Sequence, residues 1–176
     1  TKAVAELFNW GDYMHLTLVG RFLSALADVG VIFILYKLSK KVWASLFYAL
    51  MVLPIQLAHF YAVDPWLNLF LVLSFYAAFN WPVWVVGIFL GLALSCKITA
   101  LLFLPIIGLI FLKRFSADIK KLLLIAIYLL LITSATARIF SPYSFINLFT
   151  LNPKFIDNLK QLQSFSDPNT WFPPAI

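Results

Sequence analysis

The sequence has little of what the surface of a soluble domain requires. Only 11% of its 176 residues are charged, 63% are apolar, and the mean hydropathy is +0.95. Soluble domains carry about 25% charged residues. Because so few charges cannot cover a water-exposed surface, we predict an integral membrane protein with an all-α, polytopic transmembrane helical bundle.

The sequence also lacks the residues of several common functional sites. It has a single cysteine, Cys96, in an apolar context, which excludes a disulfide framework and a metal-thiolate cluster within the chain. It contains no P-loop, no glycine-rich dinucleotide turn, no nucleophile elbow and no zinc motif. The enzyme classes that depend on those motifs are therefore set aside.

Acidic residues are scarce as well, so the formal net charge is +6. The basic residues form short clusters between apolar runs rather than a stripe along a polar face. That distribution is typical of membrane topology signals and not of a phosphate-binding surface. We accordingly expect the lipid bilayer, and no nucleic acid, as a partner.

Six apolar runs have the composition of membrane spans. A span needs about 20 helical residues to cross hydrocarbon about 30 Å thick. The runs cover residues 16–36, 42–63, 66–79, 83–95, 100–112 and 122–140, and Pro54 is expected to kink the second. Because the third and fourth are short, either this pair does not cross at full depth or its ends lie in polar surroundings within the bundle. Residues 1–15 are predicted to end an outer loop, 16–140 to form the membrane core, and 141–176 to form an outer-face tail without a further span.

The basic clusters predict an orientation. Residues 37–41 and 113–121 hold seven of the thirteen Lys and Arg residues, and alternation of six spans puts both segments on one side. By the positive-inside rule this side is cytoplasmic. The same alternation assigns to the outer face, along with the tail, the polar residues Arg21, His59, Asp64, Lys97 and Arg138.

Asp64 lies at the boundary between two apolar runs and has two interpretations. It is followed by Pro65, and Asp before a proline at the first helical position is a common helix start, so one interpretation is a cap. The other is an active-site carboxylate, since an acid at a membrane boundary is tolerated but calls for a reason. The local sequence by itself favours the cap.

The predicted outer-face cations also have two interpretations. Arg21 and Lys97 are both placed where a basic side chain can extend to the headgroup layer. Converging on one face with a carboxylate, they also suit an anionic phosphate, for which Arg offers a bidentate fork and Lys a point charge. His59 is open to proton transfer or to a polar contact between helices, and we favour the contact.

Two further polar residues lie in or at the end of predicted spans. Asp28 is too deep for chemistry at the outer face, and we expect it to be a buried hydrogen-bond partner between helices. Arg138 closes the last span together with aromatic residues, which is typical of a membrane interface. We also count it, with Arg21 and Lys97, among the cations available to a substrate phosphate.

Several segments carry a family resemblance. Residues 20–26 leading into a basic turn, 56–64, and 87–101 ending in Leu104-Pro105 resemble the membrane core of the GT-C glycosyltransferases. Within that superfamily they are most similar to the prokaryotic protein mannosyltransferase and aminoarabinose transferase group. The tail segments 141–145, 152–159 and 172–174 resemble an outer loop of one subgroup. The resemblance covers nearly the whole chain, although each motif is short and apolar.

This resemblance implies an inverting transferase that moves a sugar from a polyprenyl-phosphate carrier to a protein, lipid or glycan acceptor at the outer face of the cell membrane. Lys97 and Arg21 would then bind the donor phosphate. Asp64 would be the second acidic residue of the site, orienting the acceptor, the sugar or a divalent cation. For Asp64 the resemblance shifts the balance from a cap to a functional carboxylate.

The chain departs from the family in one respect. The principal catalytic acid of the family lies in the first outer loop, after a first span that this chain lacks, and neither Glu6 nor Asp12 stands in its acidic motif. We therefore assign no catalytic base and expect it upstream of Thr1, in a longer protein. A transporter or flippase-like protein is the alternative from another class, although the two halves of the chain share no repeat. A noncatalytic membrane scaffold subunit is a third.

Overall fold

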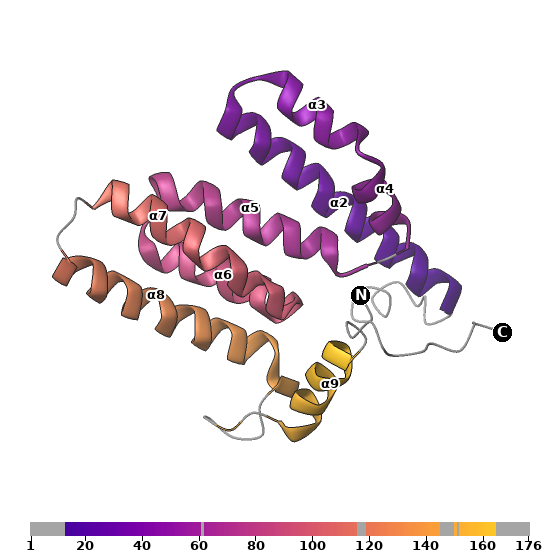
Figure 1. Cartoon of the computed structure of the whole chain (residues 1–176). Coiled ribbons are helices and arrows are strands. Elements are labelled where there is room, and N and C mark those ends of the chain that lie inside the picture. Colours follow the sequence, from indigo (N-terminus) through magenta and orange to yellow (C-terminus); the bar gives the residue numbers. More distant parts are fainter. Residues whose placement is uncertain (1–12, 61, 116–118, 145–149, 151, 165–176) are drawn as a thin grey trace. The chain divides into compact units, whose positions relative to one another are not determined.

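The computed structural model describes residues 13–60, 62–115, 119–144, 150 and 152–164, which are helical apart from short connections and contain no strand (Figure 1). The all-α prediction is thus confirmed for these residues. The elements are α2 (Tyr13–Ser39), α3 (Val42–Leu50), α4 (Val52–His59), α5 (Asp64–Asn80), α6 (Val83–Cys96), the 3-10 helix η1 (Ile98–Phe103), α7 (Leu104–Arg114), α8 (Ile119–Phe140), the 3-10 turn η2 (Pro142–Ser144) and α9 (Pro153–Ser164). The chain divides into two compact units, Thr1–Ala137 and Arg138–Ile176.

In the first unit, small residues are buried and large apolar residues are exposed. The buried face of α2 carries Ser24, Ala27 and Val31, all nearly inaccessible. The other face carries side chains such as Phe22 and Phe33, which are more than half exposed. A soluble protein would not expose apolar surface on this scale, whereas small residues between helices and large ones facing lipid are typical of membrane bundles.

Only some of the helices are long enough to cross a membrane. Met14–Ser39 and Lys120–Phe140 have the required length and hydropathy, and α3 with α4 would make a third span if the bent pair is one segment. α5 has 17 residues and α6 has 14, or about 25 and 21 Å of helix. Candidate membrane spans are therefore present, but the prediction of six full spans is not confirmed.

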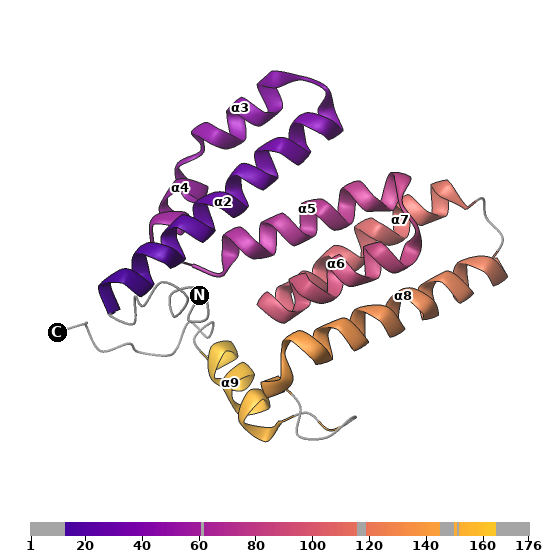
Figure 2. The ribbon, with the colours of Figure 1, turned by 180° about the vertical axis from the view of Figure 1, so that it is seen from behind.

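The second predicted span, 42–63, is broken. The 54° bend between α3 and α4 occurs at Met51, whose backbone is extended, and α4 ends at His59. A proline ring clashes with the carbonyl four residues earlier, which for Pro54 is that of Leu50. The kink expected from Pro54 is therefore present, but it lies three residues before the proline and is a complete break (Figure 2).

The fifth predicted span, 100–112, is also not a single helix. The 3-10 helix η1 precedes α7, which begins at Leu104 with Pro105 in its first turn. Proline is favoured in a first turn because it has no N–H to leave unpaired. Pro105 therefore marks the start of α7.

Helices α6 and α8 approach each other closely at two glycines. A Cβ on Gly87 would lie 2.8 Å from Cγ2 of Ile132, and one on Gly91 would lie 2.7 Å from the carbonyl oxygen of Thr133. The hydroxyl of Thr133 donates a hydrogen bond to the carbonyl of Gly87 at 3.3 Å. Gly-x-x-x-Gly is a spacing that lets membrane helices pack backbone to backbone. It fixes α6 against α8.

The prediction that Asp28 forms a hydrogen bond between helices is confirmed. The Tyr48 hydroxyl, on α3, donates to Oδ1 of Asp28, on α2, at 2.8 Å. Asp28 is half-buried rather than fully buried. The bond satisfies a polar group that an apolar environment would otherwise penalise.

We expect Tyr48→Phe to destabilise the first unit, because it leaves the Asp28 carboxyl without this donor. Hydrogen bonds between membrane helices are worth about 0.6 kcal/mol on average and up to about 1.7. Thermal unfolding in detergent should therefore show a loss of about 1 kcal/mol. Tyr128→Phe is the matched control, since Tyr128 is 48% exposed on α8. An equal loss in both variants would show that the Asp28 bond contributes nothing.

The described part of the C-terminal unit contains no helix after Phe140 that is long enough to cross a membrane. Its main element is α9, which begins at Pro153. The side-chain oxygen of Asn152 accepts a hydrogen bond from the backbone N–H of Lys154 at 3.1 Å. Asn followed by Pro is a favoured helix start because it supplies a cap and a preformed first turn.

Candidate functional site

Asp64 and Lys97 form an ion pair. The Lys97 ammonium donates a hydrogen bond to Oδ1 of Asp64, with Nζ and Oδ1 2.9 Å apart. Asp64 is the first residue of α5, and Lys97 follows the last residue of α6. The fold thus joins two sites that the sequence analysis singled out separately and that are 33 residues apart.

The local backbone explains why both side chains are available for this contact. Lys97 is extended, with φ −157° and ψ 133°, because the chain leaves α6 here and enters η1. The cap position of α5 is Val63, Asp64 is the first helical residue, and among the described residues the Asp64 carboxylate accepts its hydrogen bond from Lys97. The carboxylate is therefore bonded to Lys97, which is not what the cap interpretation predicts.

The ion pair is accessible and structurally weak. The Asp64 side chain is 31% exposed and that of Lys97 is 50% exposed. Ion pairs at that exposure contribute about 0 to 1 kcal/mol to stability. Both groups can consequently exchange their mutual contact for a ligand at small cost.

A second polar contact lies at the opposite end of α5. One Arg114 amino group donates to the carbonyl oxygens of Ala78, at 2.8 Å, and of Trp81, at 2.7 Å. It thereby satisfies carbonyls that the end of a helix leaves unpaired. The sequence analysis counted Arg114 only as part of a basic segment. The sequence shows that Arg114 lies near the end of an apolar run. It does not show that the Arg114 side chain binds carbonyl oxygens at the end of another helix, α5.

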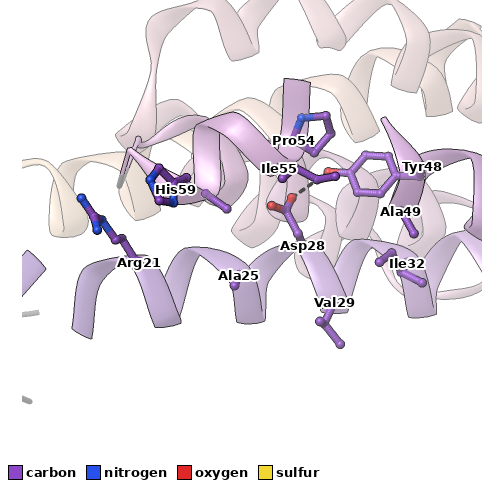
Figure 3. Close-up of a pocket in the computed structure, with 11 residues that line it drawn as sticks. Arg21, Ala25, Asp28, Val29, Ile32, Tyr48, Ala49, Pro54, Ile55 and His59 are labelled. Carbon is purple, nitrogen blue, oxygen red and sulfur yellow. Dashed lines mark hydrogen bonds between the residues drawn. The ribbon is translucent and has the colours of Figure 1, made fainter. Parts of the chain in front are cut away.

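Arg21 and His59 meet at another place, a groove between α2 and the α3–α4 pair (Figure 3). The groove has a volume of about 390 Å³. Arg21 and His59 lie at one end of it, and Asp28 with Tyr48 lies further along. His59 also packs edge to face on Phe60, with ring centroids 5.6 Å apart. This contact is with the next residue along the chain, so the polar contact between helices favoured for His59 stays a prediction.

Arg138 belongs to the C-terminal unit. Its guanidinium donates to the carbonyl oxygen of Pro142 at 3.5 Å, just past the end of α8. The predicted site residues therefore fall into three groups, which are the Asp64–Lys97 pair, the Arg21–His59 groove end and the Arg138 helix end. Glu6 and Asp12 lie outside the described residues.

A divalent cation was considered for the carboxylate. Within the described ranges, no three His, Cys, Asp or Glu side chains come together as a protein-held metal would require. Calcium and magnesium take about six or more oxygen ligands. Asp64 would therefore need most of its co-ligands from substrate, from water or from elsewhere in the chain.

Comparison of the chain with protein-family models, with curated proteins and with solved structures yields no match.

Proposed function

We propose that the chain is part of an integral membrane glycosyltransferase with a GT-C-like core of about six spans. It would move a sugar from a polyprenyl-phosphate carrier to an acceptor at the outer face of the membrane. One observation carries the proposal, namely that a carboxylate and an ammonium meet at the ends of two helices in an otherwise apolar bundle. The motif resemblance around Asp64 and Lys97 gives that pair its proposed chemistry.

The pair suits a reaction in which negative charge develops at a phosphate. In an inverting transfer the acceptor oxygen attacks the anomeric carbon, and the bond from that carbon to the phosphate oxygen breaks with its electron pair moving to the phosphate. Lys97, released from Asp64, would stabilise that charge. Asp64 would orient the sugar or the acceptor, while the acceptor proton goes to a catalytic base that we do not assign. Arg21 and Arg138 remain predicted phosphate ligands.

The depth of Lys97 also supports a lipid-linked donor. Helix α6 is about 21 Å long, which is shorter than the roughly 30 Å of hydrocarbon. If α6 starts at the inner boundary, its far end lies below the outer boundary, where a lipid phosphate held against the membrane can contact Lys97. The Arg114 contact at the other end of α5 fits the inner side assigned to the basic residues.

The orientation is testable by labelling. In a Cys96→Ser background, a membrane-impermeant thiol reagent should modify Ser166→Cys in intact cells and leave Ser116→Cys unmodified, since the tail is predicted outside and residues 113–121 inside. Both serines should become reactive once the membrane is permeabilised. The reverse pattern in intact cells would place Lys97 on the cytoplasmic side and refute the proposed active face.

Transfer itself is testable with Lys97→Gln in the full-length protein. The donor is a polyprenyl-phosphate sugar with a radiolabel in the sugar. The radioactivity transferred to the acceptor is measured, and a reaction without the donor is the blank. We expect Lys97→Gln to lower turnover by about tenfold or more, equivalent to about 1.4 kcal/mol of transition-state stabilisation. Lys37→Gln, at the other end of α2, is the matched control for a lost cation. Normal turnover of Lys97→Gln at equal expression would mean that Lys97 only anchors its helix.

One observation favours the alternative of a transporter. Broken helices next to a charged residue within the membrane are typical of ion and substrate sites in transporters, and α3–α4 breaks beside Asp28. Flux of a polyprenyl-phosphate sugar across proteoliposomes, without transfer to acceptor, would support that function. A scaffold subunit would show neither activity.

A further inference from the structure

The groove between α2 and α3–α4 is a cavity that the proposed transfer reaction leaves without a role, apart from Arg21. Its walls are mostly apolar and include Ala25, Val29, Ile32 and Ile55. A volume of about 390 Å³ is within the range of ligand pockets, which is about 300–1,000 Å³. The groove lies along α2, a candidate membrane span, so hydrocarbon would surround most of its length if α2 crosses the membrane.

The groove is electrostatically asymmetric. At one end Arg21 makes no hydrogen bond or ion pair within the described part of the chain, and His59 lies next to it (Figure 3). Two helical turns further along, Asp28 and Tyr48 satisfy each other by their 2.8 Å hydrogen bond. Among the residues that line the groove, the cation is Arg21, and it lies at one end. Because Asp28 and Tyr48 are hydrogen-bonded to each other, a ligand needs no polar group in the deeper part of the groove.

The Arg21 guanidinium lies within a candidate span and calls for an anionic partner. Arg21 lies eight residues after Tyr13, or about 12 Å along α2, and a charge in that position is costly unless it has a counter-ion. An arginine fork matches phosphate oxygens, and His59 can supply a further donor. An apolar channel leading away from such a fork matches a hydrocarbon chain attached to the phosphate.

We propose that this groove binds one acyl chain of an anionic phospholipid, with the phosphodiester held by Arg21 and His59 and the chain lying along Ala25, Val29 and Ile32. The site goes beyond the proposed transfer function, because it binds bilayer lipid and needs no reaction. It assigns to Arg21 the phosphate of a bilayer lipid, in place of the donor phosphate predicted for Arg21 from the sequence.

The test measures lipid preference of the purified full chain in neutral detergent. Fluorescent phosphatidylglycerol and phosphatidylcholine with identical chains are titrated separately and followed by anisotropy. We expect tighter binding of phosphatidylglycerol, and Arg21→Gln should reduce this preference by about fivefold, since one basic residue contributes about 1 kcal/mol to anionic lipid binding. Lys37→Gln removes a cation from the other end of the same helix and should change the preference less than about twofold.

A second variant tests the groove rather than the charge. Val29 is 59% exposed, so Val29→Trp fills the groove without displacing the core, and it should weaken phosphatidylglycerol binding with Arg21 intact. Soluble glycerol phosphate should not displace the lipid, because the acyl chain supplies most of the affinity. Equal binding of the two lipids, unchanged binding in Val29→Trp, or displacement by glycerol phosphate would each overturn the proposal. Displacement of the phospholipid by an equimolar amount of polyprenyl phosphate would assign the groove to the donor instead.

Discussion

Asp64→Asn in the full-length protein is expected to lose most transfer activity while retaining its thermal stability within a few degrees. The substitution changes few atoms but removes the negative charge that orients substrate in the proposed site. The stability loss is expected to be small, because the ion pair with Lys97 is exposed and such pairs contribute about 1 kcal/mol or less. A decrease in turnover of about tenfold or more corresponds to about 1.4 kcal/mol of lost transition-state stabilisation.

The charge-reversed double variant, Asp64→Lys with Lys97→Asp, separates a structural from a functional role. If the pair only links the start of α5 to the end of α6, reversing both charges should restore whatever the single variants lose. If Lys97 binds phosphate and Asp64 orients substrate, the double variant should fold and remain inactive. Full activity in Asp64→Asn would rule out a functional carboxylate, and the ion pair would then be a surface contact.

The largest effect on stability is expected for Gly91→Leu. A Cβ at Gly91 would lie 2.7 Å from the backbone oxygen of Thr133 and 3.0 Å from Cγ2 of Thr136, so α6 and α8 would have to separate. Overpacking of a closed interface costs about 1–3 kcal/mol and occasionally more. We expect a loss at or above the top of that range, measured as a reduced unfolding temperature in detergent.

Gly108→Leu is the matched control for Gly91→Leu. A Cβ at Gly108, on α7, meets nothing within 4 Å. Leucine also has a higher helix propensity than glycine, by about 0.8–1.0 kcal/mol. The control should therefore be neutral or more stable than the parent. Similar destabilisation in both variants would mean that the close approach of α6 to α8 is not required for stability.

Local signals in the sequence accounted for most of the helices and several of their ends. No helix was predicted in residues 141–176, although Asn152-Pro153 is a favoured helix start and α9 begins there with the Asn152 side chain as its cap. Asp64-Pro65 marks the start of α5, two residues before the predicted span. Signals of this kind act over a few residues, since caps and prolines alter only nearby backbone groups. They can be read without knowing what the helix packs against.

The position of the break in the second predicted span could not be derived in the same way. Pro54 indicated a kink, but a proline permits several responses, from a gentle bend to a full interruption. In the structure the chain is extended at Met51, and the bend lies beside the hydrogen bond from Tyr48 to Asp28. The local sequence limits where the helix can break, and tertiary contacts select the conformation.

The sequence by itself determined the class of this protein, because apolar composition and the scarcity of charge leave a helical membrane protein as the viable architecture. It also identified Asp64 and Lys97 as charged residues at the ends of apolar runs, and therefore as candidates for a functional role. Only the tertiary structure decided that these two residues, 33 positions apart, are partners, and that Arg21 is instead beside His59. The physical reason is that such pairings depend on how each helix is rotated and shifted against its neighbours. That register is set by the packing of small residues such as Gly91 and Ser24 across whole helices, and no short segment of sequence contains it.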